Sequence, residues 1–101
     1  MNTVVISGRL VRDIEIKAIK TGHKCTSFSV AVPKNKDEAN FIDCVAWDET
    51  ANFIGNYFHK GSPIEIEGSI QTRMYHAADD RNIKITEVAV RRVYFSGPKE
   101  K

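Results

Sequence analysis

The sequence has few of the residues that build disulfide frameworks, metal centres or membrane spans. Its 101 residues include only two cysteines, Cys25 and Cys44, and these lie outside any metal-binding spacing. Both fall in apolar, strand-like stretches, where a free cysteine packs as a small hydrophobic residue. No segment has the length and apolarity of a membrane helix, and the first ten residues lack the apolar core of a signal peptide. These absences predict one domain in the reducing cytoplasm, with no metal and no cofactor.

The motifs of common catalytic sites are also missing. The sequence has no nucleophile elbow, no phosphate-binding glycine loop and no HExxH motif. His23, His59 and His76 fall in expected turns or loops, far apart in the chain, where solvated histidines are common. Asp79 and Asp80 fall in an expected hairpin tip, which favours a solvated turn over a metal site. We therefore expect a protein that is not an enzyme.

The net charge is small, but its distribution is uneven. A formal charge of +2 does not by itself indicate a polyanionic partner. Residues 1–24 contain five basic residues and two acidic ones, whereas residues 25–60 are rich in acids. A basic face on a nearly neutral protein is therefore expected. The hydrophobic fraction of 42% is sufficient for the core of one domain.

Alternating apolar and polar residues predict a chain made mostly of strands. The longest alternation is IEIEGSIQTRMY, where the even positions from Ile64 to Met74 form the expected core face and the odd positions up to Tyr75 form a polar face. Strands are expected over residues 3–11, continuing through 15–19, and over 24–32, 41–47, 63–75 and 83–95. Helical spacing follows the third strand, with Asp48 as the expected N-cap and Gly61 as the expected stop.

This order of elements indicates an all-β fold, a five-stranded Greek-key OB-fold barrel with one short helix between strands 3 and 4. Crossover helices do not alternate with strands, which argues against a parallel α/β fold. Gly8 in the first strand indicates a sharp bend, and a shift of apolar parity between Ile85 and Val88, reversed at Val93, indicates a bulge. We expect residues 1–96 to form the barrel and residues 97–101 a short polar tail.

The strand over residues 41–47 has two faces that could each be the core. Phe41, Asp43, Val45 and Trp47 share one face, and Ile42, Cys44 and Ala46 share the other. Hydrophobicity alone permits the aromatic face to be buried. Asp43 argues against this, because burying an unpaired carboxylate is costly. The smaller, wholly apolar face suits a barrel interior, in which case Phe41 and Trp47 lie on the outer surface.

Outward aromatics beside basic residues suggest a binding surface. Tyr75 lies on the polar face of its strand together with Arg73. With Phe41 and Trp47 it completes the composition of a platform for unpaired bases, because every base has a π-face on which an aromatic ring can stack. By this pattern alone, a protein-interaction surface is an equally open alternative.

Five segments carry a resemblance to a known family: VVISGRLVRDIEI, TGHKCTSFSVAV, FIDCVAW, NYFHKGSPIEIEGSIQTRMY and TEVAV. In order and spacing they resemble bacterial and phage single-stranded DNA-binding proteins, the SSB family, over nearly the whole chain up to about Phe95. The resemblance implies an OB-fold that assembles as a homotetramer and binds and protects single-stranded DNA in replication, recombination or repair. It implies no catalysis and no cofactor, and a place in the cytoplasm beside the nucleoid.

The resemblance also implies roles for individual residues. Base-stacking positions of the family match Phe41, Trp47 and Tyr75. Contacts to the DNA backbone are expected from five basic residues: Arg9, Lys17, Lys36, Lys60 and Arg73. Of these, Lys36 stands where some members have a further stacking aromatic.

Several positions depart from the family pattern. Asp43 and Glu49 stand where some members are basic, which implies weaker binding or a different site size. Ile42 stands where many members have a histidine at the subunit contact, so the tetramer geometry is expected to differ. The chain ends in SGPKEK, without the acidic, aromatic tip that recruits replication and repair proteins, so no such recruitment is expected from these residues.

Two other functions are compatible with the pattern. One is an OB-fold protein-interaction module of a primosome or replication complex, whose partner would bind whether or not DNA is present. The other is an RNA-binding role like that of cold-shock proteins, although the short aromatic strand motifs of that class are absent. Competition between a partner and oligo-dT, and a comparison of DNA with RNA affinity, would separate these functions.

Overall fold

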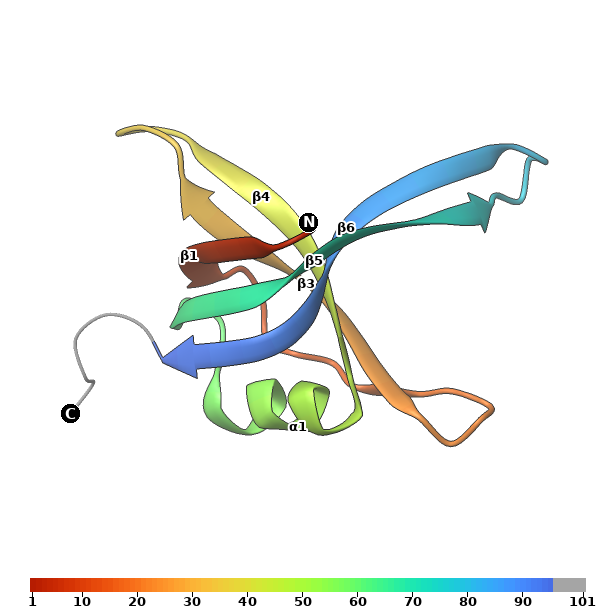
Figure 1. The fold of residues 1–101 in the computed structure, drawn as a ribbon, viewed down its shortest axis with the longest axis horizontal. Helices are drawn as coiled ribbons and strands as arrows, with labels where there is room; N and C mark the ends of the chain where they lie inside the picture. Colours follow the sequence, from red (N-terminus) through yellow and green to blue (C-terminus); the bar gives the residue numbers. More distant parts are fainter. Residues whose placement is uncertain (96–101) are drawn as a thin grey trace.

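The computed structural model describes residues 1–95, which form a strongly curved sheet with one helix beneath it (Figure 1). Its strands and helix, in chain order, are β1 (Val4–Leu10), β2 (Lys17–Ala18), β3 (Lys24–Pro33), β4 (Ala39–Trp47), α1 (Asp48–Tyr57), β5 (Pro63–His76) and β6 (Asn82–Phe95). The β3–β4 and β5–β6 hairpins diverge as they extend from the barrel (Figure 1). The predicted tail, residues 97–101, and residue 96 lie outside the described residues.

The strands pair in the order β1-β5-β6-β4-β3-β2, and a further pairing of β1 with β3 closes the barrel. Only β4 and β6 run parallel. The expected strand over residues 15–19 is reduced to Lys17–Ala18, which continues β1 along the edge of β3. Counting β1 and β2 as one interrupted strand, the predicted five-stranded OB-fold barrel with a helix after the third strand is confirmed.

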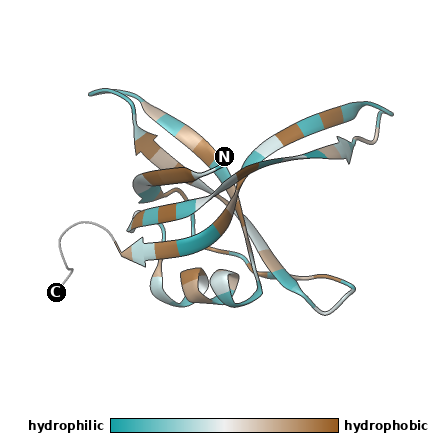
Figure 2. Ribbon diagram, viewed as in Figure 1, coloured by the Kyte–Doolittle hydropathy of each residue, from teal (hydrophilic) through white to brown (hydrophobic). Residues whose placement is uncertain are grey.

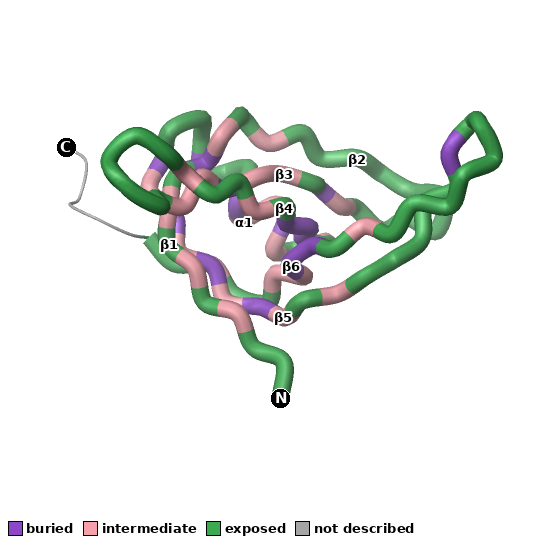
Figure 3. Tube along the Cα trace, turned by 90° about the horizontal axis from the view of Figure 1, so that it is seen from above, coloured by how far each residue is buried: buried purple, intermediate pink, exposed green. Residues whose placement is uncertain are grey.

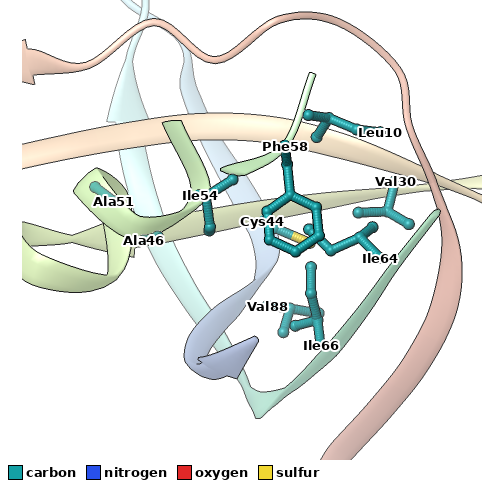
Figure 4. Packing of buried hydrophobic residues seen from close by; sticks show 10 residues of the cluster. All are labelled: Leu10, Val30, Cys44, Ala46, Ala51, Ile54, Phe58, Ile64, Ile66 and Val88. Atoms are coloured by element: carbon teal, nitrogen blue, oxygen red, sulfur yellow. The ribbon is translucent and has the colours of Figure 1, made fainter. Parts of the chain in front are cut away.

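The core joins the inner faces of the strands to α1, as Figure 4 shows. Its buried members are Leu10, Val30, Cys44, Ala46, Ala51, Ile54, Phe58, Ile64, Ile66 and Val88. Cys44 and Ala46 are at most 1% exposed, which confirms that the small apolar face of β4 points inward. Burial raises the pKa of the Cys44 thiol to about 12, so this thiol stays protonated and unreactive near neutral pH.

The expectation for the even face of β5 is wrong beyond Gly68. Ile64 and Ile66 are buried, but Ile70 is 49% and Met74 63% exposed. The pairing of β1 with β5 ends at Gly68, and beyond it β5 pairs only with β6. We call residues 69–76 and 82–89 the arm; at its base Val88 and Ala89 also pair with β4, and beyond them it is two-stranded. Hydrophobic and hydrophilic residues still alternate along it (Figure 2), and most of its length is exposed (Figure 3), except for the buried Glu87 and Val88 near its base.

The predicted bulge in the last strand lies at Arg91. Gly68 pairs with Val90 and Glu67 with Arg92, so Arg91 has no partner in the register. Its guanidinium donates a hydrogen bond to the Gly68 carbonyl oxygen at 3.2 Å. The bulge coincides with the end of the barrel, where the arm begins, and it accounts for the return of apolar parity at Val93. The earlier parity shift occurs within regular pairing, because Val88 lies in the core whereas Ile85, farther out on the arm, is only partly buried.

The expected helix N-cap at Asp48 is wrong. The N-cap residue is Trp47, and no side chain caps the helix. Asp48 is the first helical residue, with a φ of 47°, and its carboxylate reaches back to the start of β3 instead. It accepts hydrogen bonds from the Lys24 backbone N–H and from His23 Nδ1, both at 3.0 Å. The helix also ends earlier than expected, at Tyr57, and Gly61 forms the following turn with a φ of 88°.

These contacts predict an acid-dependent contribution of Asp48 to stability. Chiefly because of the Lys24 N–H bond, the pKa of Asp48 lies below its ordinary value of 3.8. A carboxylate with a lowered folded-state pKa stabilises the fold above the ordinary value and loses that contribution as the pH falls through the folded value. The stability of the wild type relative to Asp48→Asn should therefore decline as the pH falls below the ordinary pKa of 3.8 and through the lowered folded-state pKa. Urea denaturation at each pH measures this, and a pH-independent difference would contradict it.

A second stability prediction concerns Thr26, which is 2% exposed. Within residues 1–95, its Oγ1 is the only buried side-chain nitrogen or oxygen without a hydrogen-bond partner. Because a buried hydroxyl without a partner is destabilising, Thr26→Val should raise the free energy of unfolding by about 1 kcal/mol. Thermal melts check this, with Thr72→Val on the exposed arm as the control expected to change little. A fall in melting temperature for Thr26→Val would show that the hydroxyl has a stabilising partner.

Candidate nucleic-acid interface

The three aromatics singled out from the sequence all lie on outer surfaces. Phe41 is 65%, Trp47 45% and Tyr75 50% exposed. Phe41 and Trp47 belong to the outer face of β4, opposite Cys44 and Ala46, so the alternative in which they form the core is excluded. Val45, on the same outer face, is nevertheless only 6% exposed. Tyr75 pairs with Ile83 far out on the arm.

Phe41 lines an open groove of about 1000 Å³. The groove runs from the loop after β1, across β3 and β4, to the arm, where it reaches the pair of Arg73 with Ile85. Six charged side chains line it: Arg12, Asp13, Glu15, Asp43, Arg73 and Glu87. Two of these side chains are basic and four are acidic, so the groove carries a net negative charge. This differs from the basic face that the sequence suggested. A polyanion would therefore meet repulsion at the groove floor unless its charges lie elsewhere.

At the arm side of the groove, Arg73 is held by a buried carboxylate. Glu87 is 5% exposed, and its Oε2 accepts hydrogen bonds from Arg73 Nε at 2.9 Å and from Gln71 Nε2 at 2.8 Å. Half of the Arg73 side chain is exposed, so its remaining N–H groups are available to a ligand. Sequence reasoning missed Glu87. The signal was a carboxylate within the apolar run TEVAV, where burial requires a partner.

Strand pairing places a basic residue and an aromatic on the same outer face at two positions. Arg9 pairs with Ala31, which pairs with Phe41. Directly paired residues point to the same side of a sheet, so these three form a row across β1, β3 and β4. A second row across β2, β3 and β4 contains Lys17, Cys25 and Trp47. In each row a small residue separates the cation from the ring by two strand spacings, roughly 10 Å.

The remaining predicted contact residues are more scattered. Arg9 Nη1 donates to the Gly61 carbonyl oxygen at 2.9 Å, so its guanidinium turns toward the loop after α1. Lys60 lies in that loop, and its backbone N–H donates to Asp13 Oδ1 at 2.7 Å. Lys36 is exposed at the tip of the β3–β4 hairpin, away from the other four predicted contact residues in the sheet register. The structure thus places Arg73 with Phe41, Lys17 with Trp47 and Arg9 near Lys60, and leaves Lys36 apart.

Two other types of site are absent from the same part of the chain. Over residues 1–95, no group of three or more histidine, cysteine, aspartate or glutamate residues is arranged to hold a metal ion. No helix among these residues is both long and apolar enough to cross a membrane.

Comparison with known proteins agrees with the resemblance seen in the sequence. Residues 1–96 match the model of the single-strand binding protein family. The chain is 37% identical to a single-stranded DNA-binding protein of Halalkalibacterium halodurans over 98% of the chain and 62% of the relative. It is 35% identical to single-stranded DNA-binding protein 2 of Listeria monocytogenes over 98% of the chain and 66% of the relative. With the protein of Fusobacterium nucleatum the identity is 44%, over 76% of the chain and 55% of the relative.

The match covers nearly all of this chain but only part of each relative. The chain spans about 62–66% of the length of the first two relatives. The family is named for binding and not for a reaction, in agreement with the expectation that the protein is not an enzyme. The family match from residue 1 to 96, together with more than a third of residues identical to the Halalkalibacterium protein, shows that the chain belongs to the single-strand binding protein family.

Proposed function

We propose that this chain binds single-stranded DNA without strict sequence preference, and that it protects the DNA during replication, recombination or repair. The observation that carries the proposal is the exposure of Phe41, Trp47 and Tyr75 on outer faces of the barrel and arm, in a member of this family. Exposed apolar surface rimmed by polar residues often marks a binding site. Unpaired bases are suitable ligands, because base–aromatic stacking tolerates any base.

The aromatics can hold several bases of one strand. Phe41 and Trp47 are six residues apart on β4, which corresponds to roughly 20 Å along an extended strand. Tyr75 extends the surface onto the arm, on the same face as Arg73. A single-stranded segment crossing this surface would stack bases at separated points, and each stacked base is worth about 1–3 kcal/mol by alanine substitution.

Basic side chains around these rings are proposed to contact the phosphates. The proposal for Lys17 is supported by its position in the same strand row as Trp47, with Cys25 between them, and that for Arg73 by the N–H groups that Glu87 leaves unused. Lys60 lies in the loop after α1, to which Arg9 is hydrogen-bonded, and Lys36 at the hairpin tip is a further contact. Because each phosphate contact releases counterions, binding should weaken as salt rises.

We also propose that copies of the chain assemble into a homotetramer, as the family resemblance implies. Support comes from the outer face of β1, β5 and β6, where Val5 is 68% and Tyr94 47% exposed beside the pair of Arg92 with Glu67. Strand pairing brings Val5, Glu67 and Arg92 into one row. An apolar and charge-paired strip of this kind is suited to self-association. Light scattering of the purified protein tests the assembly.

The setting proposed for this activity is the cytoplasm, where single-stranded DNA arises beside the nucleoid, in a bacterium or a phage-infected host. The relatives that the chain matches carry further sequence beyond the matched region. Recruitment of other replication proteins is therefore a separate question from DNA binding by these residues.

The sole tryptophan provides the test, because Trp47 belongs to the proposed interface. Adding oligo-dT should quench its fluorescence through stacking, and added salt should reverse the quenching. Titrations over several oligonucleotide lengths then give the site size. An unchanged signal together with no gel shift at low salt would refute the proposal. Binding to a replication protein in place of oligo-dT would favour the interaction-module alternative.

A further inference from the structure

Asp43 has a place in the groove that the proposed stacking surface does not explain. It lies two residues from Phe41 on the outer face of β4, and both side chains line the groove. Its Oδ1 accepts a hydrogen bond from Ser29 Oγ at 3.0 Å, across the strand pair of Ser29 with Asp43. Among residues 1–95, Oδ2 has no partner, so one carboxylate oxygen is available beside the Phe41 ring.

We propose that Asp43 is a specificity-determining residue, which accepts a hydrogen bond from the exocyclic amino group of a base stacked on Phe41. This inference rests on the proposed function, because it requires a base at Phe41. It predicts a preference for cytosine over thymine or uracil at this position. The sequence-independent stacking at Trp47 and Tyr75 would be unaffected.

The chemistry of the pyrimidines gives the direction of the preference. Cytosine carries an amino donor at position 4, whereas thymine and uracil carry a carbonyl oxygen there. A carboxylate has only acceptor capacity, so it pairs with the amino group and repels the carbonyl oxygen. In single strands the hydrogen-bonding edge of the base is free to make this contact while the ring stacks. The pyrimidine rings are alike in size, so stacking on Phe41 differs little between them.

The charge of the groove favours a DNA strand that turns its bases, and not its phosphates, toward the groove floor. Asp13, Glu15 and Asp43 line the groove together with Glu87, and one of its two arginines, Arg73, is already paired with that glutamate. A phosphate at the groove floor would therefore lie among like charges, which is unfavourable. Bases carry no net charge and offer hydrogen-bond donors. The strand should thus turn its bases toward the groove floor and keep its phosphates at the rim.

Equal-length oligo-dC and oligo-dU at neutral pH test the inference, because they differ only at position 4 and at the adjacent ring nitrogen. Dissociation constants are measured by fluorescence anisotropy for the wild type, Asp43→Ala, Asp43→Asn and Glu49→Ala. The ratio of the dU constant to the dC constant should fall about 3- to 10-fold from wild type to Asp43→Ala, which is the effect of one hydrogen bond of ordinary strength at an exposed site. Asp43→Asn should lower the ratio too, since its amide can donate to the carbonyl of dU.

The control Glu49→Ala removes the same charge from an exposed residue that does not line the groove, so it should leave the ratio unchanged. Phe41→Ala should abolish the preference, because no base is then held beside Asp43. Equal changes in both constants for Asp43→Ala would show that Asp43 acts only through its charge, and would overturn the inference while leaving the proposed function intact. Failure of the wild type to bind either oligonucleotide would overturn the proposed function itself.

Discussion

Replacing Phe41 and Tyr75 together with alanine is expected to weaken single-stranded DNA binding by about 2–6 kcal/mol, since each stacked base contributes about 1–3 kcal/mol. Both rings are at least half exposed, so neither supports the core. The melting temperature should therefore change little. Trp47 is retained in the double variant, so the same fluorescence titration with oligo-dT measures wild type and variant. The single variant Tyr75→Ala should show about half of the loss.

A matched control is Tyr57→Ala, because Tyr57 is 60% exposed but lies on α1, outside the groove. The centroid of the Tyr57 ring lies 5.0 Å from that of Phe53 and 6.1 Å from that of Phe95. The variant therefore measures how much the loss of an exposed aromatic ring outside the groove changes DNA binding. Its DNA affinity should match that of the wild type. Equal losses for Tyr57→Ala and the double variant would show that the effect is not specific to the proposed surface. A large fall in melting temperature for the double variant would instead assign its rings a structural role.

The sequence was sufficient to predict the outer face of β4 because two independent constraints agreed there. Asp43 could not be buried without a partner, and the opposite face was small and apolar throughout. The structure confirms the result, with Cys44 and Ala46 in the core and Phe41 and Trp47 outside. The barrel topology was also predictable, since the number and order of strands around a single helix are compatible with few other folds.

Features that depend on which strands meet were not predictable in the same way. The alternation of IEIEGSIQTRMY continues past the end of the barrel, so the pattern assigned Ile70 and Met74 to a core that ends at Gly68. Asp48 has the local signature of a helix cap, but the backbone of Lys24, distant in sequence, attracts its carboxylate. The partners of Glu87 are likewise set by the register between β5 and β6. Local patterns contain no information on such distant contacts.

Gly68 is the position where a single methyl group is expected to have the largest effect on stability. A Cβ at this residue would overlap the carbonyl oxygen of Ala89, which belongs to the backbone of β6 and cannot rotate away. Gly68→Ala should therefore destabilise the fold by about 3 kcal/mol, the upper part of the range for overpacking. For a domain of this size, that corresponds to a fall in melting temperature of very roughly 10–20 °C. Thermal melts followed by circular dichroism measure it.

The same substitution should also affect DNA binding, because Gly68 is the last residue of β5 that pairs with β1 before the arm begins. Relief of the overlap requires β5 and β6 to separate there, which displaces Arg73 and Tyr75 relative to Phe41. Oligo-dT affinity measured well below the melting temperature should thus fall, although no contact residue is changed. Ser69→Ala is the control, and it should alter both quantities only slightly. Since the obstacle is a backbone oxygen, adding Ala89→Gly should not restore stability; if it did, the clash would involve the Ala89 side chain instead.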